Sequence, residues 1–272
     1  MKPGMKHGSK IFLALLLLLT ACSRECVLRL ATTTSVENTG LLDYLLPDFE
    51  KKYHCRVEVI AVGTGQALTL GKRGDVDLVL THNPAAEKKL VEEGYFTGRY
   101  EIAWNDFVIV GPEEDPAGVR GASSAAEAFR RIAKAGYPFV SRGDESGTHL
   151  KEKAIWEEAG VNPSGPWYLS VGMGMGQTLI IAQEKRAYTL TDRGTFLSMR
   201  DKLPDLVILM DGARADRSLI NVYSLLPVAK GRDSRIVTAF VNWFLSPETQ
   251  ERIGQFGRDK TGEPLFHPGV ER

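Results

Sequence analysis

Short apolar runs alternate with segments of helical period in the first third of the chain. The apolar runs lie at 27–33, 57–62 and 77–80, and each ends in a turn rich in glycine, hydroxyl or amide residues. The helical segments that follow these turns lie at 41–53, 66–74 and 84–94. Strands that alternate with helices in this way form parallel sheets with helices on both faces. The pattern therefore predicts an α/β fold, in which ligands bind beyond the carboxyl ends of the strands.

A second α/β block follows, between two extended apolar segments at 104–112 and 219–231. Pairing of these two segments would carry the chain into a second lobe and back. The predicted divisions are 1–21 as a signal segment, 22–112 as the first part of lobe 1, 113–215 as lobe 2, and 216–272 as the return to lobe 1. A single continuous doubly wound domain is the competing arrangement, and the pattern alone leaves it open.

The amino-terminal segment is typical of an export signal. Three lysines precede an apolar run from Ile11 to Leu19, which is too short to span a bilayer in a folded membrane protein. The run ends in Leu19-Thr20-Ala21-Cys22, which resembles the lipobox of bacterial lipoproteins. We therefore expect an exported protein that is anchored to the cell membrane by a lipid on Cys22. An ordinary cleaved signal peptide, with Cys22 incidental, is the alternative.

Two further cysteines each precede an apolar strand. Cys26 and Cys55 would lie side by side if their strands are parallel neighbours, and export exposes them to oxidising conditions. A disulfide between them and a pair of free thiols remain equally open. No metal-ligand spacing accompanies these cysteines or the five histidines, so we expect no metal cation.

The charge balance argues against a polyanionic partner. The chain has 34 basic and 34 acidic residues, whereas nucleic-acid binding usually needs a concentrated basic face. We therefore expect no nucleic acid as a partner, and a small ligand remains compatible with the composition.

Three predicted strand-to-helix turns carry the candidate chemistry. They contain Thr33, Thr34 and Ser35 in the first turn, Thr64 in the second, and Ser146, Gly147 and Thr148 in the third. The first N–H groups of a helix are unpaired and its dipole is positive there, so such turns bind anions. Helix capping alone explains each turn taken singly. Their convergence at one edge of the fold, with Arg142 next to the third, favours an anion site.

Other kinds of site are poorly supported. The segments GTGQAL and GMGMG lack the spacing of dinucleotide and triphosphate motifs. Ser146, His149 and Asp144 are the residue types of a catalytic triad, but His149 falls in the first turn of the helix that Ser146 caps. A secreted serine hydrolase is therefore a minor alternative, and we expect neither an enzyme nor a cofactor.

The segment SRGDESGTH is similar to a segment of the phosphate-binding proteins of ABC importers. Together with TTTS, GTGQAL and DVDLVLTH, it makes nearly the whole chain after the signal resemble the tungstate-binding components of tungstate importers. The resemblance implies a type II periplasmic-binding-protein fold with two lobes, each a mainly parallel sheet flanked by helices, and a ligand cleft between them. It implies a monomer that delivers tungstate or molybdate to the permease and ATPase subunits of an ABC importer. The oxoanion-contacting positions that it implies are Thr33, Thr34, Ser35, Thr64, Arg142, Ser146, Gly147 and Thr148.

One position bears on which oxoanion binds. The related phosphate binders place an aspartate after the third strand, where it accepts the proton of hydrogen phosphate. Here that strand runs into Thr81-His82-Asn83, with no carboxylate. A buried carboxylate would repel a fully ionised dianion, so its absence favours tungstate, molybdate or sulfate. A phosphate-type binder is the alternative function, and His82 is equally well explained as a ligand donor or a surface histidine.

Overall fold

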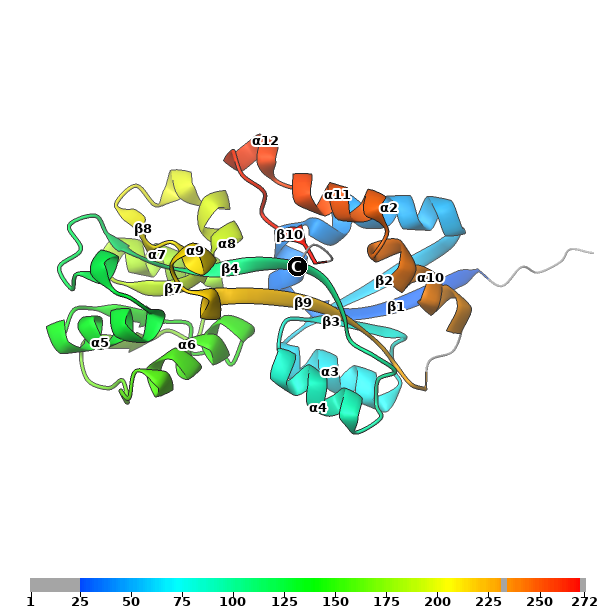
Figure 1. Cartoon of the computed structure of the whole chain (residues 1–272), viewed down its shortest axis with the longest axis horizontal. Helices are drawn as coiled ribbons and strands as arrows, with labels where there is room; N and C mark the ends of the chain where they lie inside the picture. The colour runs from blue at the N-terminus through cyan, green and yellow to red at the C-terminus, as the bar shows by residue number, and fades with distance from the viewer. Residues whose placement is uncertain (1–24, 231–233, 270–272) are drawn as a thin grey trace, which may run out of the picture.

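A computed structural model describes residues 25–230 and 234–269 of the 272-residue chain. It has two lobes, and two long strands that lie side by side connect them (Figure 1). These crossing strands are β4 (Tyr100–Pro112) and β9 (Ile220–Pro227), which pair in antiparallel fashion. The predicted signal segment 1–21 and Cys22 lie outside the described residues. Within the described ranges, every helix is too short or too polar to cross a membrane.

The first lobe is built on three strands that the sequence predicts. Strand β1 (Cys26–Thr33) pairs in parallel with β2 (Cys55–Val62) on one side and β3 (Leu78–Thr81) on the other. Its helices in this part of the chain are α1 (Thr34–Thr39), α2 (Leu41–Tyr53), α3 (Thr64–Arg73) and α4 (Pro84–Glu92). Because the strands run in one direction, the turns after them meet at the edge that faces the second lobe (Figure 1).

A disulfide joins β1 and β2 where both strands begin. Cys26 and Cys55 are partners in the parallel register, with Cα atoms 4.5 Å apart, and their sulfur atoms are bonded. The structure therefore has the disulfide rather than two free thiols. A crosslink over 29 residues stabilises a fold by about 3 kcal/mol, chiefly because it restricts the unfolded chain. It lies at the opposite end of these strands from the turns that face the second lobe.

The second lobe uses the far half of β4 as one of its strands. Strands β7 (Thr189–Asp192) and β8 (Leu206–Met210) pair antiparallel with β4 from Phe107 onward. Strands β5 (Phe139–Ser141) and β6 (Tyr168–Ser170) pair in parallel. The helices are α5 (Ala125–Ala135), α6 (Gly147–Glu158), α7 (Met175–Lys185), α8 (Arg193–Ser198) and α9 (Gly212–Ala215), with short 3-10 turns at Val119–Gly121, Arg200–Lys202 and Arg217–Leu219.

One detail of this lobe differs from the sequence prediction. Its strand pairing is mixed, because β7 and β8 run antiparallel to β4. The cause is that the crossing strand is itself part of the second sheet, since its 13 residues pair with β9 as far as Asp106 and with β7 from Phe107 onward. The predicted boundaries of the two lobes stay a prediction.

The carboxyl-terminal segment packs on the first lobe and forms two main helices there. Helix α10 (Ser234–Phe244) is followed by α11 (Pro247–Gln255), the short α12 (Arg258–Thr261) and the edge strand β10 (His267–Pro268), which pairs with β4. Helix α12 contacts α8 of the second lobe and lies over the space between the lobes (Figure 1). This segment therefore spans the interface of the two lobes.

Each lobe has an apolar core of its own. Phe49, Phe240 and Phe244 are buried in the core of the first lobe, and Phe129 and Trp156 are buried in that of the second. Burial of a large aromatic side chain is among the strongest stabilising contributions available to a fold. Separate cores make each lobe a rigid unit, so that a site between them can be opened and closed by motion at the crossing strands.

Candidate functional site

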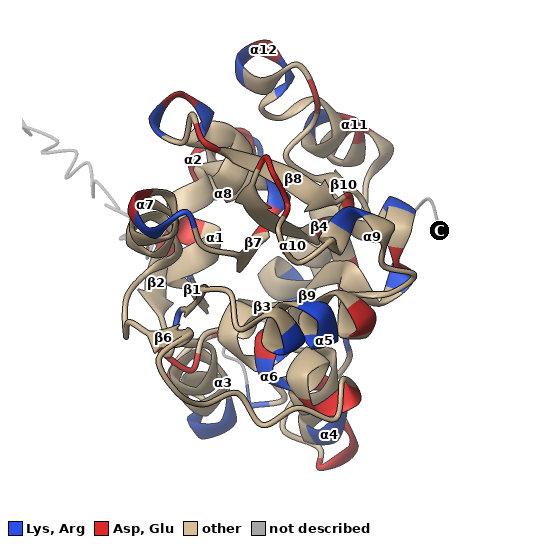
Figure 2. Cartoon of the chain, turned by 90° about the vertical axis from the view of Figure 1, so that its left-hand side faces the viewer, with Lys and Arg blue, Asp and Glu red and all other residues tan. Residues whose placement is uncertain are grey.

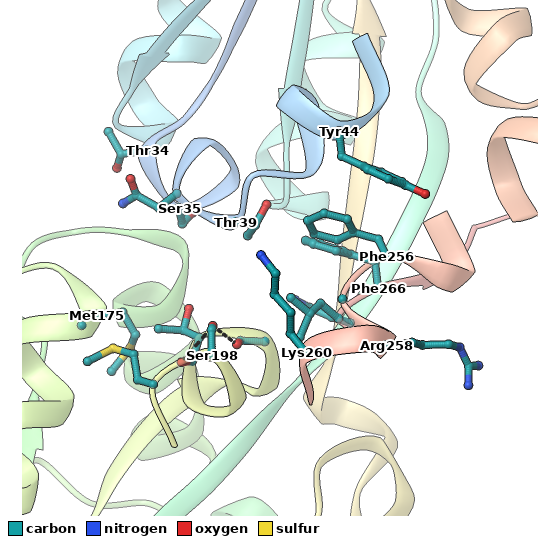
Figure 3. Close-up of a pocket in the computed structure, with 18 of the residues that line it drawn as sticks. Thr34, Ser35, Thr39, Tyr44, Met175, Ser198, Phe256, Arg258, Lys260 and Phe266 are labelled. Atoms are coloured by element: carbon teal, nitrogen blue, oxygen red, sulfur yellow. Dashed lines mark hydrogen bonds between the residues drawn. The ribbon is translucent and has the colours of Figure 1, made fainter. Parts of the chain in front are cut away.

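A cavity of about 790 Å³ lies between the lobes. Its lining includes residues from both lobes and from a crossing strand, among them Thr34, Ser35, Asn38, Asn105, Arg142 and Gly174. Figure 3 shows Thr34 and Ser35 on the first lobe opposite Met175 and Ser198 on the second. Tyr44, Phe256 and Lys260 lie along another side of it (Figure 3). The cavity is thus bounded by several separate segments of the chain.

Arg142 brings a buried positive charge to this cavity. It follows directly after β5, and only 6 % of its surface is exposed. One of its terminal nitrogens, Nη2, donates to Asp144 Oδ2 at 2.5 Å. Its Nε is buried and has no hydrogen-bond partner among the residues that the structure describes. A buried N–H without a partner is costly, so this atom marks a place where an acceptor belongs.

Asp144 has a supporting role beside this arginine. Its Oδ2 accepts from Arg142, and its Oδ1 accepts from the backbone N–H of Ser146 at 3.2 Å. The neighbouring acid, Glu145, pairs with Lys153 at 2.9 Å and accounts for the other negative charge of this segment. The carboxylates of SRGDESGTH therefore hold Arg142 and the turn in place, as a group that orients a ligand-binding residue does.

The start of α6 packs against the first lobe. Ser146 caps this helix by accepting from the N–H of His149 at 3.3 Å. A Cβ atom at Gly147 would lie 2.2 Å from Cε1 of His82, so glycine is needed for this close approach. The two lobes touch here. Ser146, Gly147 and Thr148 are not among the described residues that line the cavity, so a direct role for them in binding remains a prediction.

The first predicted turn does reach the cavity. Thr33 caps α1 by accepting from the N–H of Val36 at 3.2 Å, and its hydroxyl lies 2.9 Å from the Ser35 hydroxyl. Thr34 and Ser35 line the cavity. Thr33 is not among the described lining residues and contacts Ser35 through its hydroxyl. The second turn is placed differently. Thr64 is buried where α3 begins and is not among the described lining residues.

His82 is a buried part of this region and is not a surface histidine. Its surface is 7 % exposed, and its ring stacks on Tyr223 at a centroid distance of 5.1 Å. Nε2 lies 3.2 Å from Ser35 Oγ, and Nδ1 lies 3.1 Å from Asn221 Oδ1. Burial lowers the pKa of His82 below its ordinary value, so the ring is neutral near neutral pH. His82 therefore positions Ser35 without adding charge.

Sequence reasoning missed two groups in the cavity wall. Asn105, on crossing strand β4, is 2 % exposed, and its Nδ2 has no hydrogen-bond partner among the described residues. Gly174 lies at the N-cap of α7 and, as a glycine, offers no side-chain hydrogen bond to the first N–H groups of that helix. A glycine before a helical period could have indicated the second group. Nothing in the local pattern around Asn105 distinguishes it from an edge-strand residue.

A buried ion pair fixes the second lobe to the crossing strand beside the cavity. Asp106, next to Asn105, accepts from Arg193 Nε at 2.7 Å and from its Nη2 at 2.8 Å. Asp106 also accepts from the backbone N–H of Ala213 at 2.9 Å. Bidentate pairing of this kind is specific in geometry as well as strong. It secures the position of α8, which supplies part of the cavity wall.

Within the described ranges, no group of three or more His, Cys, Asp or Glu side chains is arranged to hold a metal cation. Two residues of the cavity wall, Arg142 and Asn105, each have a buried N–H donor without a partner among the described residues. Such donors bind oxygen atoms that carry negative charge.

Comparisons with known proteins agree with this geometry. A family model described as a PBP superfamily domain matches residues 23–248. The tungstate-binding protein TupA of Peptoclostridium acidaminophilum is 43% identical over 250 residues, which cover 89% of this chain and 86% of that protein. The structure of the tungstate-binding protein TupA from Desulfovibrio alaskensis G20 is 45% identical with a TM-score of 0.79, covering 90% of this chain and 100% of that one. The structure of the tungstate ABC transporter from Geobacter sulfurreducens is also 45% identical, with a TM-score of 0.73 and coverage of 85% and 98%.

Proposed function

The chain belongs to the periplasmic-binding-protein (PBP) superfamily, and we propose that it captures tungstate outside the cytoplasm and delivers it to an ABC importer. Molybdate, which has the same shape and charge, is its expected second ligand. The two lobes close over the oxoanion, and donors from both sides replace its hydration shell. Separation of the lobes then releases the anion to the permease.

The proposal rests chiefly on the position and charge of Arg142. It is a buried cation in the cavity between the lobes, with an Nε that lacks a partner among the described residues. A charge-assisted hydrogen bond contributes about 1.5–3 kcal/mol, so a few such bonds to one anion give tight capture. The planar fork of a guanidinium can hold two oxygens of the same anion with parallel N–H donors, a geometry that the single nitrogen of a lysine does not provide.

The surroundings of Arg142 favour an anion that carries no proton. The third strand runs into Thr81-His82-Asn83, in the segment where the related phosphate binders are expected to have an aspartate, and His82 is neutral and bonded to Ser35 and Asn221. Hydrogen phosphate would need an acceptor for its proton, and this residue does not supply a carboxylate there. Tungstate and molybdate need donors only, which fits Arg142 and the hydroxyl turn.

We propose a binding protein without catalytic activity. Ser146 Oγ accepts from the backbone of His149, and the His149 ring accepts from the N–H of Glu145 at 3.0 Å. This places the ring against the turn backbone, whereas a catalytic triad needs the histidine to take the serine proton. A serine-directed covalent probe is expected to leave Ser146 unlabelled.

The cellular setting follows from the sequence features and the superfamily. We propose that residues 1–21 direct export and that Cys22 carries the lipid anchor, so that the protein works as a monomer beside the permease and ATPase subunits. Figure 2 shows Lys and Arg interspersed with Asp and Glu on the outer helices, and the chain has equal numbers of both signs. This distribution does not suit nucleic acid as a partner.

A thermal-shift panel of oxoanions tests the proposal. A ligand that binds only the folded state raises the melting temperature by mass action, so tungstate and molybdate should give large shifts. Sulfate and phosphate should give small ones at equal concentration, because the smaller anions leave some donors unpaired. A larger shift with phosphate than with tungstate would assign the protein to the phosphate-type binders, and no shift with any oxoanion would contradict the proposal.

A further inference from the structure

We propose that Asn105 is a further oxoanion-binding residue, which donates from Nδ2 and selects against anions that carry a proton. The inference rests on the proposed function, since it concerns the same cavity. Asn105 lines this cavity, is 2 % exposed, and has an Nδ2 without a hydrogen-bond partner among the described residues. A buried amide nitrogen in a cavity wall has donors to offer to whatever the cavity holds.

The partner of its amide oxygen sets the orientation of this side chain. Asn105 Oδ1 accepts from Asn221 Nδ2 at 2.8 Å, across the paired strands β4 and β9. If the amide group of Asn105 flipped, its Nδ2 would face Asn221 Nδ2. Asn221 Nδ2 would then lose its acceptor, and two donors would lie against each other. The oxygen therefore stays on Asn221, and the nitrogen stays available to the cavity.

Asn221 is fixed in turn by two more residues. Its Nδ2 also donates to Tyr223 Oη at 2.8 Å, and its Oδ1 lies 3.1 Å from Nδ1 of His82. In this arrangement Nδ1 of the neutral His82 ring is the donor, and Nε2 is left to accept from the Ser35 hydroxyl at 3.2 Å. The chain of hydrogen bonds runs from Ser35 through His82 and Asn221 to Asn105, and both of its ends lie on the cavity.

The direction of these hydrogen bonds gives the two ends of the chain different roles. The Ser35 hydroxyl donates a hydrogen bond to His82 and accepts one from Thr33, whose hydroxyl lies 2.9 Å away. Asn105 Nδ2 lies near the Tyr223 hydroxyl but makes no well-aligned hydrogen bond among the described residues. The strand residue Asn105, together with Arg142 of the second lobe, therefore supplies donors to the anion, while the Ser35 hydroxyl mainly holds the chain in this direction.

A donor at this position discriminates by proton content. A fully ionised oxoanion offers lone pairs in every direction, whereas hydrogen phosphate must also place an O–H against an acceptor. Because Asn105 sits on a crossing strand, its position does not depend on which lobe moves during closure. The selecting group is thereby present in both the open and the closed arrangement.

The test replaces the donor by an acceptor of the same shape. In Asn105→Asp, titration calorimetry should show tungstate affinity at least about a hundredfold weaker, since a carboxylate repels the dianion and removes its donor. The preference between tungstate and hydrogen phosphate should shift towards hydrogen phosphate. Asn105→Ala, which removes the donor without adding charge, should weaken tungstate binding about tenfold.

Asn162→Asp is the matched control, because Asn162 is exposed and is not among the described residues that line the cavity. It introduces the same charge and should change the affinity for tungstate no more than about threefold. Equal effects of Asn105→Asp and Asn162→Asp, or an unchanged preference between the two anions, would overturn the assignment of Asn105. Failure of the unaltered protein to bind any oxoanion would instead overturn the proposed function.

Discussion

The two lobes face the same cavity with different chemistry. The second lobe brings a buried cation, Arg142, whereas the first lobe brings hydroxyl groups, Thr34 and Ser35, and a neutral histidine behind them. The cations that the first lobe brings to the cavity wall, Arg258 and Lys260, are exposed, so Arg142 is the cation of this wall that is buried. The difference shows how one arginine can serve as the main charge of a site that both lobes complete.

Removal of the charge from the second lobe should have the largest effect. In Arg142→Ala the affinity for tungstate should fall at least about thirtyfold, since loss of one member of a buried charge pair costs about 2–5 kcal/mol. Arg142→Lys keeps the charge but lacks the planar fork, and should recover only part of the affinity. Titration calorimetry measures both variants, with the exposed Arg186→Ala of the same lobe as a control. Near-native binding by Arg142→Ala would show that Arg142 is not the main charge that binds the anion.

The second lobe also contains a buried acid on α6, which affects its stability more than its binding. Glu152 is 2 % exposed and accepts from Tyr168 at 2.8 Å and from Trp156 at 3.1 Å. Burial is the main cause that raises its pKa from 4.5 to about 7. Because the folded state holds this proton more tightly than the unfolded state, stability falls as the pH rises from 4.5 to about 7.

Glu152→Gln should remove this pH dependence, because glutamine keeps the shape and the acceptor oxygen without the charge. The contribution is on the order of 3 kcal/mol in the free energy of unfolding, so the variant should be clearly more stable than the unaltered protein at pH 8 and similar at pH 4.5. Urea denaturation at the two pH values measures it. Glu158→Gln, on the exposed side of the same helix, serves as the control. If the unaltered protein and Glu152→Gln lose stability equally with rising pH, the buried acid is not its source.

A hydroxyl of the first lobe should matter least. Ser35→Ala removes one neutral hydrogen bond to His82, which contributes about 1 kcal/mol, so the affinity for tungstate should fall about fivefold. Ser198→Ala, on the cavity wall of the second lobe, should change it less, since that hydroxyl is bonded within its own helix to Gly194. A loss at Ser35 as large as that at Arg142 would show that Ser35 does more than hold the hydrogen bonds of His82 in one direction.

Local patterns predict much of this molecule. Short stretches of sequence are enough to recognise the alternation of strands and helices, the crossing segments and the turns at the carboxyl edge. The resemblance that singled out Arg142 also rests on such short stretches. The cavity, however, also depends on contacts between distant positions. Asn105 meets Asn221 across 116 positions of the chain, and His82 meets Gly147 through the closeness of the two lobes. No local pattern carries such pairings, because they depend on the register of the crossing strands.

Crystals of the protein grown with tungstate would test the central claim most directly, since tungsten gives a strong anomalous signal that locates the anion without a model of the protein. The account predicts one peak in the cavity between the lobes, with tungstate oxygens within hydrogen-bonding distance of Arg142 Nε and Asn105 Nδ2. A peak at the protein surface, or one in the cavity but beyond the reach of Arg142, would contradict it.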